Sequence, residues 1–260
     1  TRVEAYYKAF NQLLLGSLET PETTAARIAG YDFPAELTWS IPSAPIITSV
    51  PANQGRGRAY GIDVYVAKPA VSATDRFTGW ASYTWGKAQT TAYGRTYAAD
   101  YDTRHSLSMV GTYALSRSLD LAGTVRVQSG FPYTPAVGVR VASVADRFDV
   151  DGDGNIEELI PQRDSRGLLV WAADYGDVSN LKAARLPLYA RVDIRATYKP
   201  RWMDDRWQLY VEVINVLNRK NAGSLESTLE YDPASDRPRL VTRPGSALPL
   251  LPTVGLRFRF

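Results

Sequence analysis

Apolar residues recur at every second position along several stretches of this chain, and this alternation limits the fold more than any other feature. In the clearest stretch, residues 190–198, the alternate residues are Ala190, Val192, Ile194, Ala196 and Tyr198. The residues between them are polar and carry charges of both signs. Successive side chains of a β-strand point to opposite faces, whereas an amphipathic helix needs apolar spacings of three and four. The stretch therefore predicts a strand with one apolar and one polar face.

The same alternation appears in about seven further segments, which gives roughly eight strands in total. They lie near residues 3–13, 60–66, 77–88, 107–115, 119–128, 207–213 and 254–260. Aromatic residues make up 11% of the chain, and this enrichment favours β-structure. The longer segments span about 10–12 residues, which is longer than the ~5–6 of soluble strands and close to the ~9–11 that cross a bilayer.

The connections between the predicted strands alternate between short and long. The short ones lie near residues 69–75, 116–118 and 200–206, and the long ones near 16–56, 89–101, 135–186 and 219–248. Outer-membrane barrels have short periplasmic turns at one end and long extracellular loops at the other. We therefore expect an all-β fold, an antiparallel transmembrane β-barrel segment. A soluble β-sandwich binding module is an alternative.

Composition excludes several classes of function. The chain has no cysteine and one histidine, His105, so thiolate zinc sites, cysteine nucleophiles and sites with several histidines are ruled out. No G-x-S-x-G nucleophile motif accompanies His105, and we expect no enzymatic activity. The net charge of +3 is spread along the chain, which argues against a nucleic-acid partner. No apolar run approaches the ~18–20 residues of a spanning helix.

Six short motifs follow one another along the chain. They are residues 55–63 (GRGRAYGID), 101–105 (YDTRH), 129–135 (SGFPYTP), 185–193 (RLPLYARVD), 213–218 (VINVLN) and 249–260 (PLLPTVGLRFRF). In this order they resemble the C-terminal part of TonB-dependent outer-membrane receptors. The resemblance extends over nearly the whole chain.

The resemblance implies a roughly 22-stranded barrel that encloses an N-terminal plug. It also implies active uptake of a scarce ligand across the outer membrane of a Gram-negative bacterium, powered by the inner-membrane TonB complex. We expect residues 1–260 to be the C-terminal portion of such a barrel, with the plug domain and the upstream strands absent. The expected partners are outer-membrane lipid, the missing strands and plug on this or a companion chain, and the TonB complex through that plug.

The main alternative to this interpretation is a self-contained eight-stranded barrel that acts as a membrane anchor or adhesin, because eight strands can close around their own side chains. The two barrel hypotheses differ in one pairing. A small closed barrel requires a backbone ladder between residues 3–13 and 252–260. A segment of a larger barrel lacks that ladder, and we expect it to be absent.

The last predicted strand ends in alternating apolar residues, and its final members are Phe258 and Phe260. Strand addition recognises an exposed edge together with alternate side chains. We therefore expect Phe258 and Phe260 to form an assembly signal for the barrel-assembly machinery.

The long segment between residues 135 and 186 contains an acidic motif. Asp149, Asp151 and Asp153 occupy positions 1, 3 and 5 of an EF-hand-like loop, Gly154 occupies position 6, and Asn155 offers a carbonyl at position 7. Position 12 is Ile160, so the usual glutamate is missing there, although Glu157 or Glu158 can take its place. The motif predicts either a structural calcium loop or an unliganded acidic turn. No other cofactor is expected.

Ligand binding is expected in the external loops. Trp39, Trp171 and Tyr175 lie in these loops, where their rings can stack on a sugar or a chelate. The sequence leaves the ligand open between a siderophore, cobalamin, an oligosaccharide and a peptide. His105 is expected at the barrel rim or in the lumen.

Overall fold

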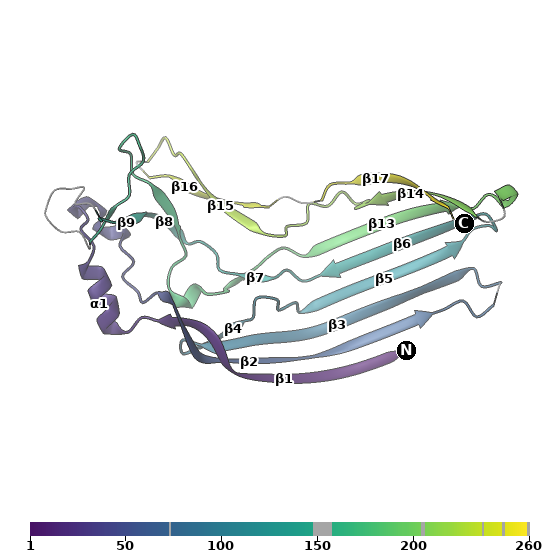
Figure 1. Ribbon diagram of the computed structural model, residues 1–260, viewed down its shortest axis with the longest axis horizontal. Coiled ribbons are helices and arrows are strands. Elements are labelled where there is room, and N and C mark those ends of the chain that lie inside the picture. Colours follow the sequence, from purple (N-terminus) through teal and green to yellow (C-terminus); the bar gives the residue numbers. More distant parts are fainter. Residues whose placement is uncertain (73, 148–157, 204–205, 236, 246–247, 259–260) are drawn as a thin grey trace.

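The computed structural model describes residues 1–72, 74–147, 158–203, 206–235, 237–245 and 248–258. The largest element of the fold is one antiparallel sheet in the order β1-β2-β3-β5-β6-β13-β14-β17, with β4 paired to β3 beside that path (Figure 1). The strands are β1 (Arg2–Leu18), β2 (Ile47–Lys68), β3 (Phe77–Ala92), β4 (Arg95–Ala98), β5 (His105–Ala114), β6 (Leu119–Gln128), β13 (Tyr189–Tyr198), β14 (Trp207–Ile214) and β17 (Leu251–Phe258).

The register places residues of one kind in rows across the sheet. One row contains Val3, Val64, Tyr83, Leu107, Val127 and Ala190. The next row contains Glu4, Asp63, Thr84, Ser106, Gln128 and Tyr189. Because neighbouring rows point to opposite faces, the sheet has one apolar face and one polar face, as the alternation predicts.

The apolar face is not covered by a second layer of protein. Val3, Val211 and Val254 belong to this face and have exposed fractions of 65%, 47% and 72%. A sandwich buries such residues between two sheets about 10 Å apart. In the part of the chain that the structure describes, no second sheet faces these residues, and the soluble β-sandwich alternative is wrong.

The two edge strands each have one partner within the described residues. β1 pairs with β2, and β17 pairs with β14. No ladder joins residues 3–13 to residues 252–258, so the predicted absence of that pairing is confirmed. The sheet is therefore open, which contradicts the self-contained eight-stranded barrel (Figure 1).

Short and long connections lie at opposite ends of the sheet, as predicted. The short connections that follow β2, β5 and β13 share one end of the sheet with the start of β1 and the end of β17 (Figure 1). The long connections lie at the other end and contain the remaining elements. We call these two regions the turn end and the loop end.

The loop end has local structure of its own. Its elements are α1 (Pro21–Ala29), η1 (Ala35–Ser40), β7 (Pro132–Tyr133), β8 (Gly138–Val141), β9 (Ser143–Ala145), β10 (Leu159–Pro161), β11 (Trp171–Asp174), η2 (Val178–Asn180), β12 (Ala184–Arg185), β15 (Leu225–Glu230) and β16 (Arg239–Pro244). A single 3-10 turn, η3 (Arg201–Met203), lies at the turn end. The four short sheets pair β10 with β9, β11 with β8, β12 with β7, and β15 with β16.

No described helix is long and apolar enough to cross a membrane.

The first hairpin is longer than the sequence pattern indicates. Strand β1 continues as far as Leu18, and strand β2 already begins at Ile47. The connection predicted at residues 16–56 therefore shortens to residues 19–46. The register shifts between Phe10 and Leu13, and Gln12 between them has φ of +57°. A bulge of this kind reverses the side-chain phase, and period-two alternation no longer marks the strand beyond it.

Candidate functional site

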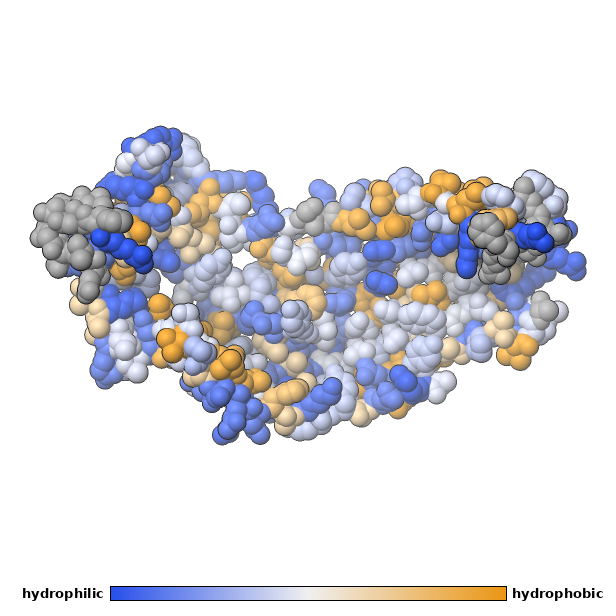
Figure 2. Space-filling model, viewed as in Figure 1, coloured by the Kyte–Doolittle hydropathy of each residue, from blue (hydrophilic) through white to orange (hydrophobic). Residues whose placement is uncertain are grey.

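The polar face carries ion pairs along β13 and its neighbours. The guanidinium of Arg191 lies 2.7 Å from the carboxylate of Asp193, which also accepts a hydrogen bond of 2.8 Å from the Asn215 backbone N–H. On β2, Asp63 accepts a hydrogen bond of 2.5 Å from the Thr84 hydroxyl. In the space-filling view, hydrophilic and intermediate colours dominate the middle of the face shown (Figure 2). These pairings give a polar wall in which Arg191, Asp193 and Asp63 have partners within the sheet.

Two tyrosines on this face pack over glycines of neighbouring strands. A Cβ on Gly255 would lie 2.2 Å from the ring of Tyr210, and one on Gly61 would lie 2.7 Å from the hydroxyl of Tyr6. The guanidinium of Arg195 lies 3.7 Å from the centre of the Tyr210 ring. Glycine is therefore required at both positions for the tyrosines to pack against the backbone.

Asp102 connects three of the sequence motifs at the loop end of β3 and β5. Its carboxylate is fully buried and accepts hydrogen bonds from the Ala88 backbone N–H at 2.6 Å and from Arg104 at 2.8 Å. Arg185 makes a further contact with the same carboxylate and donates to the carbonyls of Asp102 and Gly130. Burial alone would raise the pKa of Asp102, but these hydrogen bonds hold it below its usual value.

A second buried polar side chain, Asn215, holds the connection between β14 and β17 in place. The side-chain amide of Asn215 donates to the carbonyls of Arg219 at 3.1 Å and Leu248 at 2.7 Å. Asn215 has φ of +54°, a conformation that asparagine tolerates better than most residues. Both amide atoms of Asn221 bond to the backbone of Ala190 at 2.8 Å. The VINVLN motif thus fixes where the hairpin β15–β16 leaves the sheet.

The connection between β1 and β2 is held by a carboxylate–guanidinium pair. Arg27 on α1 bonds to Glu19 at 2.8 Å and to the carbonyls of Pro42 and Ala44 at 2.7 and 2.9 Å. The Arg27 hydrogen bond holds the pKa of the Glu19 carboxyl below its usual value. This pair fixes both ends of the segment that carries η1, and with it Trp39.

Two of the predicted ligand-binding residues come together at the loop end. The rings of Trp39 on η1 and Trp171 on β11 stack with their centroids 6.2 Å apart and an interplanar angle of 30°. The guanidinium of Arg237 lies 3.7 Å from the centre of the Trp39 ring. A cavity of about 850 Å³ adjoins this group and is lined by Trp171, Leu229, Tyr231, Ser235 and Arg237 among others. Such a size falls within the ~300–1,000 Å³ of ligand pockets.

Tyr175 lies elsewhere. It lines a separate pocket of about 150 Å³ with residues of the first connection, including Ile46, and with Val178 of η2. The sequence offers no sign of this separation, because Trp171 and Tyr175 are only a few positions apart. We define the mouth cluster as Trp39, Trp171 and Arg237.

Arg237 and Tyr231 are not among the candidates that the sequence pattern indicates. Both belong to the connection between β15 and β16, which the sequence presented as a long loop. Leu225, Ser227 and Leu229 share one face of β15, but Ser227 is polar, so the segment gives only a partial signal for a strand. It does not indicate that the hairpin tip reaches Trp39.

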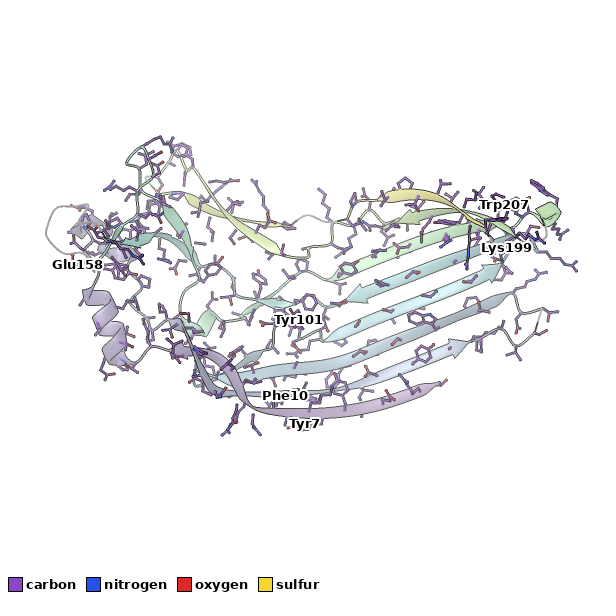
Figure 3. The ribbon with its side chains drawn as sticks, viewed as in Figure 1. Tyr7, Phe10, Tyr101, Glu158, Lys199 and Trp207 are labelled. Carbon is purple, nitrogen blue, oxygen red and sulfur yellow. The ribbon has the colours of Figure 1, made fainter. Side chains whose placement is uncertain are left out.

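The predicted calcium ligands lie almost wholly outside the described residues. Asp149, Asp151, Asp153, Asn155 and Glu157 fall within 148–157, whereas Glu158 is described and its carbonyl accepts a hydrogen bond of 2.9 Å from Asp146. Figure 3 places Glu158 at the loop end. Over the described ranges, no three acidic or histidine side chains form a metal-binding group. Calcium binding stays a prediction.

Of the two phenylalanines predicted to form the assembly signal, Phe258 is among the described residues. Phe258 ends β17, and its ring lies 4.6 Å from the ring of Trp207 on β14. Phe260 lies outside the described residues. Trp207 is labelled at the turn end in Figure 3, so this aromatic pair lies where the last two strands finish. A role of Phe258 and Phe260 in assembly stays a prediction.

His105 begins β5, as expected for a residue near the rim. Its Nδ1 lies 2.8 Å from the Tyr83 hydroxyl, and the two rings stack.

An open antiparallel sheet with an apolar outer face, a polar inner face and all long connections at one end is the architecture of an outer-membrane β-barrel wall. The chain belongs to the family described as TonB dependent receptor-like, beta-barrel, whose model matches residues 2–216. Its place is the outer membrane of a Gram-negative bacterium. The apolar face therefore contacts lipid, and the polar face lines the barrel lumen.

One solved structure is similar, the outer membrane transporter YddB from Escherichia coli. The similarity has a TM-score of 0.47 and 11% sequence identity, and it covers 99% of this chain and 30% of that chain. The present chain thus spans less than a third of the length of that transporter. No curated protein matches the sequence.

Proposed function

We propose that this chain forms part of a receptor that takes up a scarce ligand actively across the outer membrane. The observation that carries the proposal is the mouth cluster and its cavity, which lie at the loop end above a polar lumen wall. Energy would come from the TonB complex through a plug domain. The further barrel strands and the plug would lie on the same polypeptide or on a companion chain.

The lumen wall supports this proposal. Arg191 and Asp193 pair with each other, and Arg195 packs on Tyr210, so these groups need no partner inside the lumen. A plug with a polar surface can pack against such a wall and detach from it without leaving buried charges unpaired.

In the proposed ligand site, Trp39 and Trp171 offer aromatic faces and Arg237 offers a positive charge. Tyr175, in its separate pocket, would contact only a ligand large enough to reach both places. Aromatic faces stack on sugar rings and on planar chelating groups, and a guanidinium pairs with carboxylates or other anions. These side chains favour a ligand with a flat or ring-shaped part.

The test is accumulation of labelled ligand by cells that carry the receptor. Labelled ferric siderophores, cobalamin, oligosaccharides and peptides would be compared in cells with and without an active TonB complex. We expect one class to accumulate only with active TonB. The double variant Trp39→Ala/Trp171→Ala should reduce that uptake about tenfold or more, because aromatic hot spots are each worth ~2 kcal/mol or more.

Trp202→Ala is the matched control, because Trp202 is an exposed tryptophan in η3 at the opposite end. It should leave uptake unchanged. Accumulation that is equal with and without TonB activity, or equal in the two tryptophan variants, would contradict the proposal.

We also propose that the acidic segment is a calcium loop that orders the external connection. Calorimetry should give a dissociation constant of about 10⁻⁴–10⁻³ M, the range of extracellular calcium modules. The variants Asp151→Ala and Asp153→Ala should abolish the binding heat. Identical heats for the wild type and both variants would remove the site.

A further inference from the structure

The lipid-facing side of the sheet contains a hollow where three neighbouring strands carry glycine in the same row. Gly79 on β3 pairs with Gly111 on β5, which pairs with Gly123 on β6. An apolar cavity of about 570 Å³ lies over this row. Its walls include Phe77, Met109, Tyr113, Leu121 and Ile194.

The glycines are not all needed for packing within the chain. A Cβ on Gly111 would lie 3.2 Å from the Phe77 ring, so that ring covers part of the row. A Cβ on Gly123 would find no atom closer than the Asp193 carbonyl oxygen at 3.9 Å. Gly123 therefore has open space above it, although its backbone conformation would accept a side chain.

A hollow of this size on a membrane-facing surface must be filled. Protein interiors and their boundaries are packed at crystal-like density, and an empty space loses the dispersion contacts of its lining. Water is a poor occupant, because the walls are almost entirely apolar. Among the components of the bilayer, a flexible hydrocarbon chain fits a shallow apolar groove.

Positive charge lies at one end of the hollow. Lys68 pairs in register with Gly79 and lines the same cavity. Its ammonium donates a hydrogen bond of 2.9 Å to the Phe77 carbonyl and lies 3.8 Å from the carboxylate of Asp75. Asp75 is also engaged by the backbone N–H groups of Val71 and Ser72. The single long contact with Asp75 leaves donor capacity on the Lys68 ammonium.

Two arginines extend this positive charge along the turn end. Arg76 and Arg117 belong to the turns 69–76 and 115–118, which adjoin because β3 pairs with β5. Neither guanidinium has an ion-pair partner among the described residues. The charge lies beside the last rows of the apolar face, at the depth where phospholipid headgroups meet the barrel.

We propose that this hollow holds an acyl chain of an anionic phospholipid of the periplasmic leaflet, with the headgroup phosphate beside the Lys68 ammonium. The chain lies over Gly111 and Gly123, between Phe77 and Ile194. The glycine row lets it approach the backbone, and the cations at the turn end select for negative charge. The lipid site is independent of the transported ligand.

The test uses native mass spectrometry of the receptor purified in mild detergent, titrated with phosphatidylglycerol or phosphatidylethanolamine. The wild type should retain one phosphatidylglycerol tightly. Gly123→Leu fills the hollow and should weaken retention about tenfold, because the lipid loses contact with roughly two methylene groups. Ala5→Leu adds similar bulk on the same face, in the row of Ile62 and away from the hollow, and should have no effect.

The headgroup part of the proposal has its own variant. Lys68→Gln should reduce the preference for phosphatidylglycerol over phosphatidylethanolamine while an acyl chain is still retained. Heat-modifiable migration in gels would show that every variant is folded. Equal lipid retention by Gly123→Leu and Ala5→Leu would overturn the proposal, and so would retention of a second protein copy in place of lipid.

Discussion

The carboxylate of Asp102 accepts hydrogen bonds from β3, from its own loop and from the segment that opens β13. It is fully buried, whereas the side chains of Arg104 and Arg185 are 36% and 31% exposed. Removing the charge would leave two partly buried guanidinium groups without a partner. Asp102 therefore couples the stability of β3, its own loop and the segment before β13.

Asp102→Asn should destabilise the folded barrel by about 2–3 kcal/mol, less than the ~3–5 kcal/mol of a fully buried pair because solvent screens the arginines. The pKa of Asp102 is lowered in the folded state. Its stabilising effect is therefore complete above the ordinary aspartate value of about 3.9 and is lost as the pH falls through the lowered pKa.

Urea unfolding in lipid vesicles, measured at pH 7 and at about pH 3, checks this linkage. The wild type should lose stability in acid, and the difference between it and Asp102→Asn should shrink. A variant that matches the wild type at pH 7 would show that Asp102 does not couple the loops.

At the mouth, single residues could be predicted only in part. Trp39 and Trp171 stand out as aromatic residues in expected loops. Their stacking with Arg237 joins three connections that are far apart in the sequence, and no local pattern encodes that proximity. Tyr175 has the same chemical character as its neighbours, but the turn after β11 places it in another pocket. The sequence therefore predicts which aromatic residues lie in the loops, but it does not predict which of them come together in the folded chain.

The strands were more accessible to prediction than the loops. Alternation marks a strand wherever one face meets lipid and the other meets a polar lumen, as on β13 and β14. Alternation fails where both faces are exposed to the same solvent, as in the outer half of β2, which contains Pro51, Gly55 and Gly57. The short strands β7 to β12 contain two to four residues each, too few for any period to appear.

The two faces of β13 should tolerate charge differently. Ile194 is on the lipid-facing side, in the row of Gly123 and Val213, whereas Thr197 is on the lumen side in the row of Asp120. Ile194→Arg should cost about 2–4 kcal/mol near the bilayer midplane. Thr197→Arg should cost much less, because its side chain meets water and an acidic neighbour.

Folding into vesicles of defined thickness, followed by urea titration, measures both costs. Thr197→Arg serves as the control for the general effect of an added charge. Equal destabilisation at the two positions would show that the orientation of β13 is wrong.

On the scale of the whole molecule, the open sheet leaves the outer edges of β1 and β17 without a partner among the described residues. An unpaired backbone N–H or carbonyl costs several kcal/mol within lipid. Both edges therefore need further strands, and we expect them to pair with other parts of the receptor rather than with each other.

Disulfide cross-linking in the outer membrane tests this arrangement. Cysteines at Val3 and Val64, or at Val211 and Val254, face each other in register and should form a bond on oxidation. Cysteines at Val3 and Val254 should not. Efficient cross-linking of that last pair would show that the eight strands close on themselves.

The two tryptophans of β3 lie on opposite faces of the strand. Trp85 belongs to the lipid-facing row of Ile62, and Trp80 belongs to the lumen row of Ala67 and Val110. Their exposed fractions are similar, 37% and 38%. Strand β3 therefore carries two intrinsic fluorophores in different surroundings. A quencher attached to acyl chains would dim Trp85, an aqueous quencher in the lumen would dim Trp80, and the difference in their emission would report which solvent each side of the wall meets.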